Sequence, residues 1–230
     1  MSDAEKPPTE VRSTRRVARG EDAQAEKRRT ILDAALRVFA RKGFHSARVA
    51  DVAREAGVAY GLVYHYFPSK EAMLDELFDQ RWTFLLTQIA NVDKQTLTAR
   101  DKLYEVASFI IDSYRYDPEL MKVIIVEVTR AANSFGREHL PEIQAAYEGI
   151  ATIVRSAQRS GEFKDTVSPE YAALAFYGSV EQVLSGWIFG LLPENEMEFA
   201  RAKRFVVETV CGGLQATSPE WTQALSARIP

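Results

Sequence analysis

The sequence has little of what several functional classes require. Its 230 residues include one cysteine, Cys211, so neither an internal disulfide nor a cysteine zinc site is expected. The three histidines lie far apart, which argues against a histidine metal cluster. No uncharged apolar run approaches the roughly 18 residues of a membrane-spanning helix. The first ten residues, MSDAEKPPTE, lack an apolar segment, so we expect no secretory signal and a cytoplasmic location.

Motifs of the common enzyme classes are also missing. The sequence contains no Gly-rich phosphate loop and no serine-centred elbow. Glu127 and Glu181 lie in apolar surroundings and could form a pair of buried acids, although ligand or helix contacts explain them equally well. We therefore expect no catalytic residues, no metal and no cofactor. A helical-bundle enzyme and a plain helical scaffold stay as alternatives.

What the sequence does have is an uneven distribution of charge. The chain carries 29 basic and 32 acidic residues, a net charge of −3. Residues 25–70 hold nine basic and four acidic residues, whereas residues 71–230 hold 15 basic and 23 acidic ones. A basic segment ahead of an acidic body favours contact with an anionic partner such as nucleic acid, with chance composition as the alternative.

Helical periodicity begins near the start of that basic segment. Ile31, Ala35 and Val38 share one face of a helix that is expected from about Ala25 onward. Residues 1–24 show no such period and contain two adjacent prolines, so we expect a flexible arm. Its four clustered arginines suit phosphates or a minor groove, but a solvated tail is as good an interpretation.

Two short helices follow, over residues 48–56 and 59–64, with Gly57 at the break between them. This pattern is typical of a helix-turn-helix, whose second helix enters the major groove of DNA. Ser69 then has the character of a cap for a helix that continues to about Ala90.

The remaining sequence predicts a helical bundle, and the fold class is therefore all-α. Helices are expected over residues 101–116, from 118, and over 139–160, 169–190 and 196–214. The segment Val123–Val126 alone has the β-branched composition of a strand. Because no partner strand exists elsewhere, we predict that it is a buried helix.

Residues 25–74, AEKRRTILDAALRVFARKGFHSARVADVAREAGVAYGLVYHYFPSKEAML, resemble the DNA-binding domain of the TetR (tetracycline repressor) family. Its spaced anchors are Gly43-Phe44, Ala56-Gly57-Val58, Tyr64-His65-Tyr66-Phe67 and Ser69-Lys70-Glu71. The resemblance implies an arm over 1–24, a helix-turn-helix domain over 25–70, and a ligand-binding and dimerisation bundle over 71–230. It also implies a repressor that binds a palindromic operator as a homodimer and leaves it when a small apolar ligand enters the bundle.

The expected DNA contacts combine the helix-turn-helix geometry with the family's pattern. The sequence departs from that pattern where the family commonly has Ser or Thr at 48, Lys at 60 and Thr at 62, so the operator sequence does not transfer. The candidate DNA-binding residues are Arg48, Tyr60, Gly61, Leu62, Tyr64, His65 and Lys70.

The bundle carries a looser resemblance. Residues 127–163 and 178–190 are similar to the acyl-CoA-responsive fatty-acid regulators of the family, which implies an acyl chain in an apolar tunnel. Arg130, Arg137 or His139 would then meet the phosphates of the coenzyme, and another apolar or aromatic effector such as a drug is the alternative. Aromatic and apolar side chains are the candidates for the ligand site, with core packing as the other role for each. They are Trp82, Phe109, Tyr114, Val128, Phe135, Tyr147, Phe176, Tyr177 and Trp187.

Overall fold

A computed structural model describes residues 9–129 and 139–214 of the chain, with side chains over 22–126 and 139–214. Within those ranges every regular element is a helix, which confirms the all-α fold class. The chain forms two compact units, Met1–Leu77 and Phe78–Pro230. The helices are α1 (Thr9–Lys42), α2 (Val49–Ala56), α3 (Tyr60–Tyr66), α4 (Lys70–Asp93), α5 (Ala99–Tyr116), α6 (Pro118–Thr129), α8 (Leu140–Ser160), α9 (Pro169–Ile188) and α10 (Glu196–Leu214).

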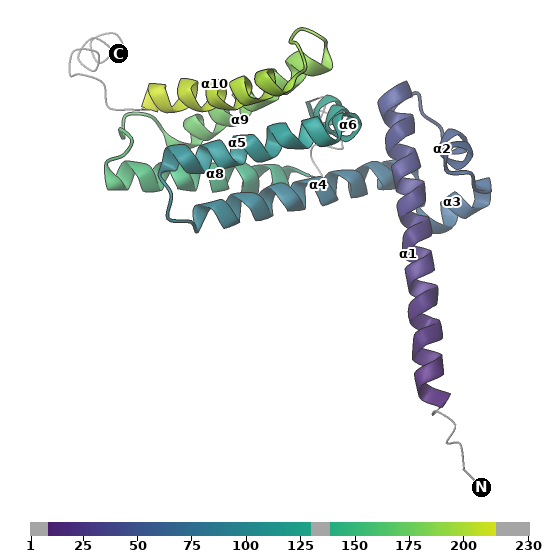
Figure 1. Ribbon diagram of the computed structural model, residues 1–230. Coiled ribbons are helices and arrows are strands. Elements are labelled where there is room, and N and C mark those ends of the chain that lie inside the picture. The colour runs from purple at the N-terminus through teal and green to yellow at the C-terminus, as the bar shows by residue number, and fades with distance from the viewer. Residues whose placement is uncertain (1–8, 130–138, 215–230) are drawn as a thin grey trace. The chain divides into compact units, whose positions relative to one another are not determined.

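The first unit, which we call the head, packs α2 and α3 beside one end of the long α1 (Figure 1). Ile31, Ala35 and Val38 of α1 are fully buried, as the periodicity predicts. Gly57 ends α2 with a φ of 66°, a conformation that glycine adopts without the steric penalty of a side chain. That tight turn sets the direction in which α3 leaves α2.

Helix α1 begins earlier than the sequence predicts. We expected a flexible arm up to residue 24, but the helix starts at Thr9. The prolines end at Pro8, and Arg, Ala, Glu and Gln dominate residues 9–24, all good helix formers. A helix nucleated in the packed region therefore continues toward the N-terminus without an apolar face.

The second unit is a helical bundle. In Figure 1, α5, α8, α9, α10 and the later part of α4 run lengthwise beside one another, while α6 is seen nearly end-on. Leu103, Ile150, Phe176 and Val206 lie in one continuous buried core. Val123–Ile125 is buried within α6, so the prediction of a buried helix rather than a strand is correct.

Polar caps fix where most helices begin. The Ser69 hydroxyl accepts from the Ala72 N–H at 3.1 Å, and the Asp117 carboxylate accepts from the Leu120 N–H at 3.0 Å. Each cap satisfies one of the N–H groups that a helix start leaves without a partner. The cap predicted at Ser69 is therefore confirmed, and Ser168 and Asn195 cap α9 and α10 in the same way.

Close contact between α4 and α8 depends on Gly149. A Cβ at this position would lie 2.7 Å from the Cγ2 of buried Ile89. We expect Gly149→Ala to lower the free energy of unfolding by about 1 kcal/mol, because overpacking outweighs the gain in helix propensity. Urea unfolding measures the change. In an Ile89→Ala background the same substitution should be neutral or stabilising, and an equal loss in both backgrounds would contradict the contact.

Candidate functional site

One face of α3 is open to solvent. Tyr60 and Tyr64 are 53% and 44% exposed, and Gly61 and His65 beside them are exposed as well. The two tyrosine rings meet edge to face with centroids 5.1 Å apart, and their hydroxyl oxygens lie 3.0 Å apart. The structure thus brings four of the predicted DNA-contacting residues onto one surface, whereas Leu62 is half-buried.

The opposite side of α3 anchors it in the head. Val63 is fully buried, and Phe67 just after the helix is 1% exposed. The Arg28 guanidinium lies 4.3 Å from the centroid of the Phe67 ring and pairs with the Glu76 carboxylate. Residues from α1 and α4 therefore hold the end of α3, so its exposed face is presented by a packed element rather than by a loose loop.

Arg48 precedes α2 and is exposed. Its guanidinium cannot accept the hydrogen bond that a Ser or Thr cap would take, but the Asp51 carboxylate still accepts from the Arg48 N–H at 3.2 Å. Within the described side chains the guanidinium makes no ion pair at 4.0 Å or less. It is therefore available to an anionic partner.

Lys70 makes contacts within the head that the sequence does not predict. Its ammonium donates to the carbonyl oxygens of Phe44, His45 and Ala47 at 2.9, 3.2 and 3.2 Å. It also lies 4.6 Å from the centroid of the Phe44 ring. Because an ammonium has three donors, the lysine is saturated by the turn that follows α1. The geometry favours a role in holding that turn against α4, and a phosphate contact of Lys70 stays a prediction.

Acidic side chains neutralise part of the head's positive charge. Glu55 accepts from Arg37 and Arg41 at 2.9 and 2.8 Å, and these bonds joining α1 to α2 hold its pKa below the ordinary value of 4.5. The pKa of Asp51 is lowered mainly by the Lys42 ammonium at 2.8 Å. Charge counted along the sequence therefore overstates what the head offers to a ligand.

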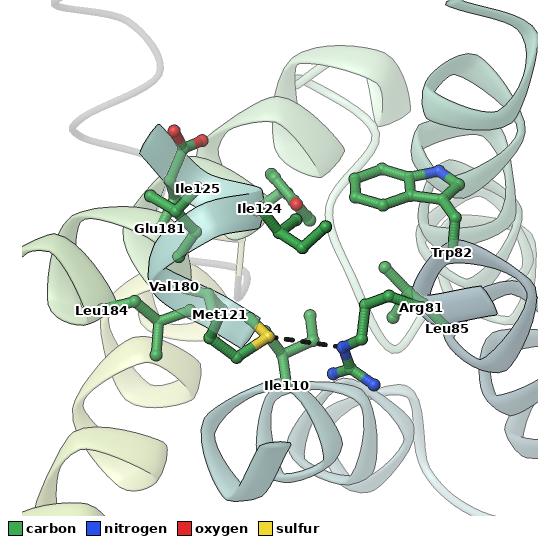
Figure 2. Close-up of a pocket in the computed structure, with 11 residues that line it drawn as sticks. Arg81, Trp82, Leu85, Ile110, Met121, Ile124, Ile125, Val180, Glu181 and Leu184 are labelled. Atoms are coloured by element: carbon green, nitrogen blue, oxygen red, sulfur yellow. Dashed lines mark hydrogen bonds between the residues drawn. The ribbon is translucent and has the colours of Figure 1, made fainter. Parts of the chain in front are cut away.

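The bundle contains a cavity between α4, α5, α6 and α9 (Figure 2). Its volume is about 20 Å³, which holds about one water molecule and no larger ligand without side-chain movement. Met121, the most adaptable of the side chains around it, lies next to Arg81. The lining residues are Arg81, Trp82, Leu85, Ile110, Met121, Ile124, Ile125, Tyr177, Val180, Glu181 and Leu184.

Two ionisable groups interrupt this apolar lining. Burial lowers the pKa of Arg81 to about 10, so the guanidinium keeps its charge near neutral pH. Burial raises the pKa of Glu181 above 4.5. In Figure 2 the two side chains stand on opposite sides of the cavity, and no ion pair of 4.0 Å or less joins them.

The predicted ligand residues divide into groups. Trp82 and Tyr177 line the cavity. Tyr147 packs its ring 5.3 Å from that of Tyr177, and Phe109 lies 4.7 Å from the Arg81 guanidinium. These four side chains form or support the cavity wall.

Three other predicted residues have structural roles. Tyr114 and Trp187 do not line the cavity, and their rings stack with centroids 5.5 Å apart. The Tyr114 hydroxyl donates to the Glu194 carboxylate at 3.0 Å, and the Trp187 indole N–H donates to the Pro193 carbonyl at 3.1 Å. Phe176 is fully buried in the core.

Several sequence-based candidates cannot be placed in this way. Val128 is in α6 with its side chain outside the described residues, and Phe135, Arg130 and Arg137 lie outside the described residues altogether. His139 is buried, with Nδ1 3.5 Å from the Asp79 carboxylate, and is not positioned for a phosphate.

Sequence reasoning missed Arg81 and Met121 and considered Glu181 only as a catalytic acid. Arg81 is half-buried and lies beside the buried stripe of α4, between the apolar Leu77-Phe78 pair and Trp82. A charged residue inside an apolar stripe is a usable signal, but arginine at a helix edge with its head in water gives the same pattern.

Two family descriptions match consecutive parts of the chain. Residues 31–77 match "Bacterial regulatory proteins, tetR family", and residues 78–204 match "YsiA-like protein, C-terminal region". The chain belongs to the TetR family. The resemblance seen in the sequence is confirmed, and with it the helix-turn-helix character of the TetR-family head.

Related proteins extend across both units. The fatty acid metabolism regulator protein of Bacillus subtilis is 28% identical over 185 residues, covering 80% of this chain and 93% of its own. The transcriptional repressor NicS of Pseudomonas putida is 25% identical over 174 residues, covering 72% and 82%. The family and these relatives are transcriptional regulators, so this TetR-family chain is a regulator and not an enzyme.

Solved structures share the fold. FadR from Bacillus subtilis, in complex with stearoyl-CoA, superposes with a TM-score of 0.72 at 24% identity, covering 81% of this chain and 98% of that one. FadR from Bacillus halodurans gives 0.73 at 21% identity, covering 83% and 97%. In the part of the chain that the structure describes, no helix has the length and apolarity to cross a membrane, and no group of three His, Cys, Asp or Glu is placed to hold a metal.

Arg48 and Lys70 give opposite expectations for this TetR-family head. Arg48→Met should leave the melting temperature unchanged and lower the salt slope of DNA binding by about one, as for one lost phosphate contact. Lys70→Met should lower the free energy of unfolding by roughly 1–3 kcal/mol, because three bonds to carbonyls are lost, and should keep the salt slope. Thermal melting and fluorescence anisotropy at several salt concentrations measure both. A Lys70→Met protein with normal stability and a reduced slope would return the lysine to the DNA interface.

The lowered pKa of Glu55 predicts acid sensitivity in the head. A carboxyl whose pKa is lower in the folded state contributes stability above pH 4.5, which is lost as pH falls through the folded value. As the pH falls from about 5 to about 3, the urea midpoint of the wild type should therefore decrease more steeply than that of Glu55→Gln. Parallel curves for the two proteins would show that Glu55 contributes nothing.

Proposed function

We propose that this TetR-family chain is a repressor that binds a palindromic operator as a homodimer and leaves it when an acyl-CoA enters the bundle. The observation that carries the proposal is the cavity enclosed by α4, α5, α6 and α9 in a chain whose head presents the open face of α3. A gap between helices that is apolar with a few polar groups is the usual form of a small-molecule site. The cytoplasm, where operator DNA lies, is the proposed location.

The acyl ligand is proposed from the relatives together with the lining. The first of the relatives described above regulates fatty acid metabolism, and a structural neighbour was solved with stearoyl-CoA. Leu85, Ile110, Ile124 and Leu184 supply the aliphatic wall that a hydrocarbon chain prefers. Since the cavity now holds about one water, ligand entry must displace side chains and move helices.

Helix α4 provides the route from ligand to head. Its first turns belong to the head, and Arg81, Trp82 and Leu85 further along the same helix line the cavity. A ligand that spreads the cavity acts directly on α4, and thereby on the element that Lys70 ties to the turn after α1. The ligand-bound and operator-bound forms then differ in the setting of α4, which makes the coupling reciprocal.

The dimer is proposed to form through α9 and α10. Tyr171 and Leu174 of α9 are 73% and 49% exposed, and Phe205 of α10 is 58% exposed. Ala175 and Gly178 continue the α9 stripe with small residues that let a partner helix approach closely. Two-fold pairing of these faces would present two α3 helices to half-sites about one DNA turn, roughly 34–36 Å, apart.

Selection from random double-stranded DNA tests the proposal, because the method works for an operator of any sequence. The full-length protein should enrich a palindrome, and analytical ultracentrifugation should give a dimer. Stearoyl-CoA should raise the operator Kd at least tenfold, whereas coenzyme A without an acyl chain should not.

Three outcomes would each contradict one part of the proposed function. Failure to enrich any DNA at low salt would contradict the operator, and a monomer with Leu174→Glu behaving as wild type would contradict the α9 and α10 interface. Release by an aromatic drug and not by stearoyl-CoA would replace the acyl ligand.

A further inference from the structure

Arg81 is a charged group that has no close carboxylate partner among the described side chains. Its Nε donates to the Sδ of Met121 at 3.3 Å, and the guanidinium lies 4.7 Å from the centroid of the Phe109 ring. No carboxylate within the described ranges lies at 4.0 Å or less, and Asp117 acts on it only from farther away. A thioether and a ring face are weak partners for a group with five donors.

This arrangement of Arg81 costs folding free energy unless another group, such as a ligand, interacts with the guanidinium. Removing a guanidinium from water carries a desolvation penalty that a nearby carboxylate normally offsets. Glu181 lines the same cavity but stands on its opposite side without an ion pair to Arg81 (Figure 2). Arg81, whose donors the protein leaves without strong acceptors, therefore lines a cavity that is otherwise almost entirely aliphatic and aromatic.

Met121 behaves as a replaceable acceptor. Its thioether is a poor acceptor on a flexible side chain, and it lines the cavity beside Arg81. A ligand oxygen arriving at Arg81 would exchange that weak bond for a charge-assisted one while Met121 adopts another rotamer. The same movement enlarges the cavity at the point where the ligand binds.

We propose that Arg81 is the polar anchor of the effector site and binds the oxygen at the carboxyl-derived end of an acyl chain. That oxygen is the thioester carbonyl in an acyl-CoA and the carboxylate in a free fatty acid. The acyl chain of the ligand then lies along Leu85, Ile110 and Ile124. The inference rests on the proposed acyl ligand and adds the residue that fixes the ligand's position in the cavity.

A matched pair of ligands tests the anchor. Stearoyl-CoA and S-octadecyl-CoA share the coenzyme and the chain, but the second has a methylene in place of the thioester carbonyl. Isothermal titration of the full-length dimer should show that the wild type binds stearoyl-CoA about 10- to 100-fold more tightly than the thioether. Arg81→Met should bind the two with equal affinity, and Arg81→Lys should recover part of the difference.

Stearate distinguishes the two sources of the oxygen. If Arg81 binds a carboxylate, stearate should bind the wild type with affinity similar to stearoyl-CoA and lose about 100-fold or more in Arg81→Met, since both charge and hydrogen bond are lost. If the thioester carbonyl is the partner, stearate should bind weakly to both proteins.

Stability provides a readout that does not depend on the ligand. Arg81→Met removes a desolvated charge that lacks an ion pair, so its urea midpoint should equal or exceed that of the wild type. The control Arg159→Met, on the exposed face of α8, should change neither ligand preference nor the midpoint.

The outcomes separate the two proposals. A wild type that binds both CoA ligands with equal affinity, with no loss of acyl affinity in a folded Arg81→Met, overturns the anchor and leaves the acyl-responsive repressor intact. A wild type that binds no acyl ligand overturns both. A less stable Arg81→Met protein would show that the arginine is a structural residue.

Discussion

One helix, α4, supplies side chains to both units of the chain. Its first residue, Lys70, saturates its ammonium with three carbonyls of the turn after α1. Eleven and twelve residues later, Arg81 and Trp82 line the cavity of the bundle. Because backbone hydrogen bonds make a helix move as a unit, an event in the cavity acts on the same element that anchors the head. The proposed ligand response therefore needs no longer chain of contacts than this one helix.

Each unit uses charge differently. In the head, Glu55 and Asp51 neutralise cations that would otherwise add to the basic surface, and these pairs join α1 to α2. Arg48 remains outside this network and α3 presents two tyrosines, so the proposed DNA-reading face offers hydroxyls, rings and close backbone approach. In the bundle, an arginine sits where its charge is costly. The first use stabilises a fold, whereas the second belongs to the binding site that we propose.

Much of the fold could be predicted from the sequence because its signals are local. The cap at Ser69, the break at Gly57 and the buried helix at Val123–Ile125 all follow from short patterns that tertiary packing did not override. The predicted start of α1, near Ala25, was wrong because residues 9–24 have helix propensity without an apolar period. The hydrogen bonds of Lys70 and the place of Arg81 at the cavity could not be predicted, since each depends on partners 23 or more residues away. Core packing and a cavity wall have the same composition, so the sequence could not separate Trp82 and Tyr177 at the cavity from the stacked pair Tyr114 and Trp187.

The central claim is that ligand in the cavity and DNA on α3 exclude each other through α4. Linkage requires that operator DNA weaken ligand binding by the same factor by which the ligand weakens DNA binding. The most direct test is the Kd of stearoyl-CoA for the protein alone and for the protein saturated with its selected operator. The account predicts a rise of at least tenfold in the DNA complex, equal to the change in operator Kd. The same Kd in both states would contradict it.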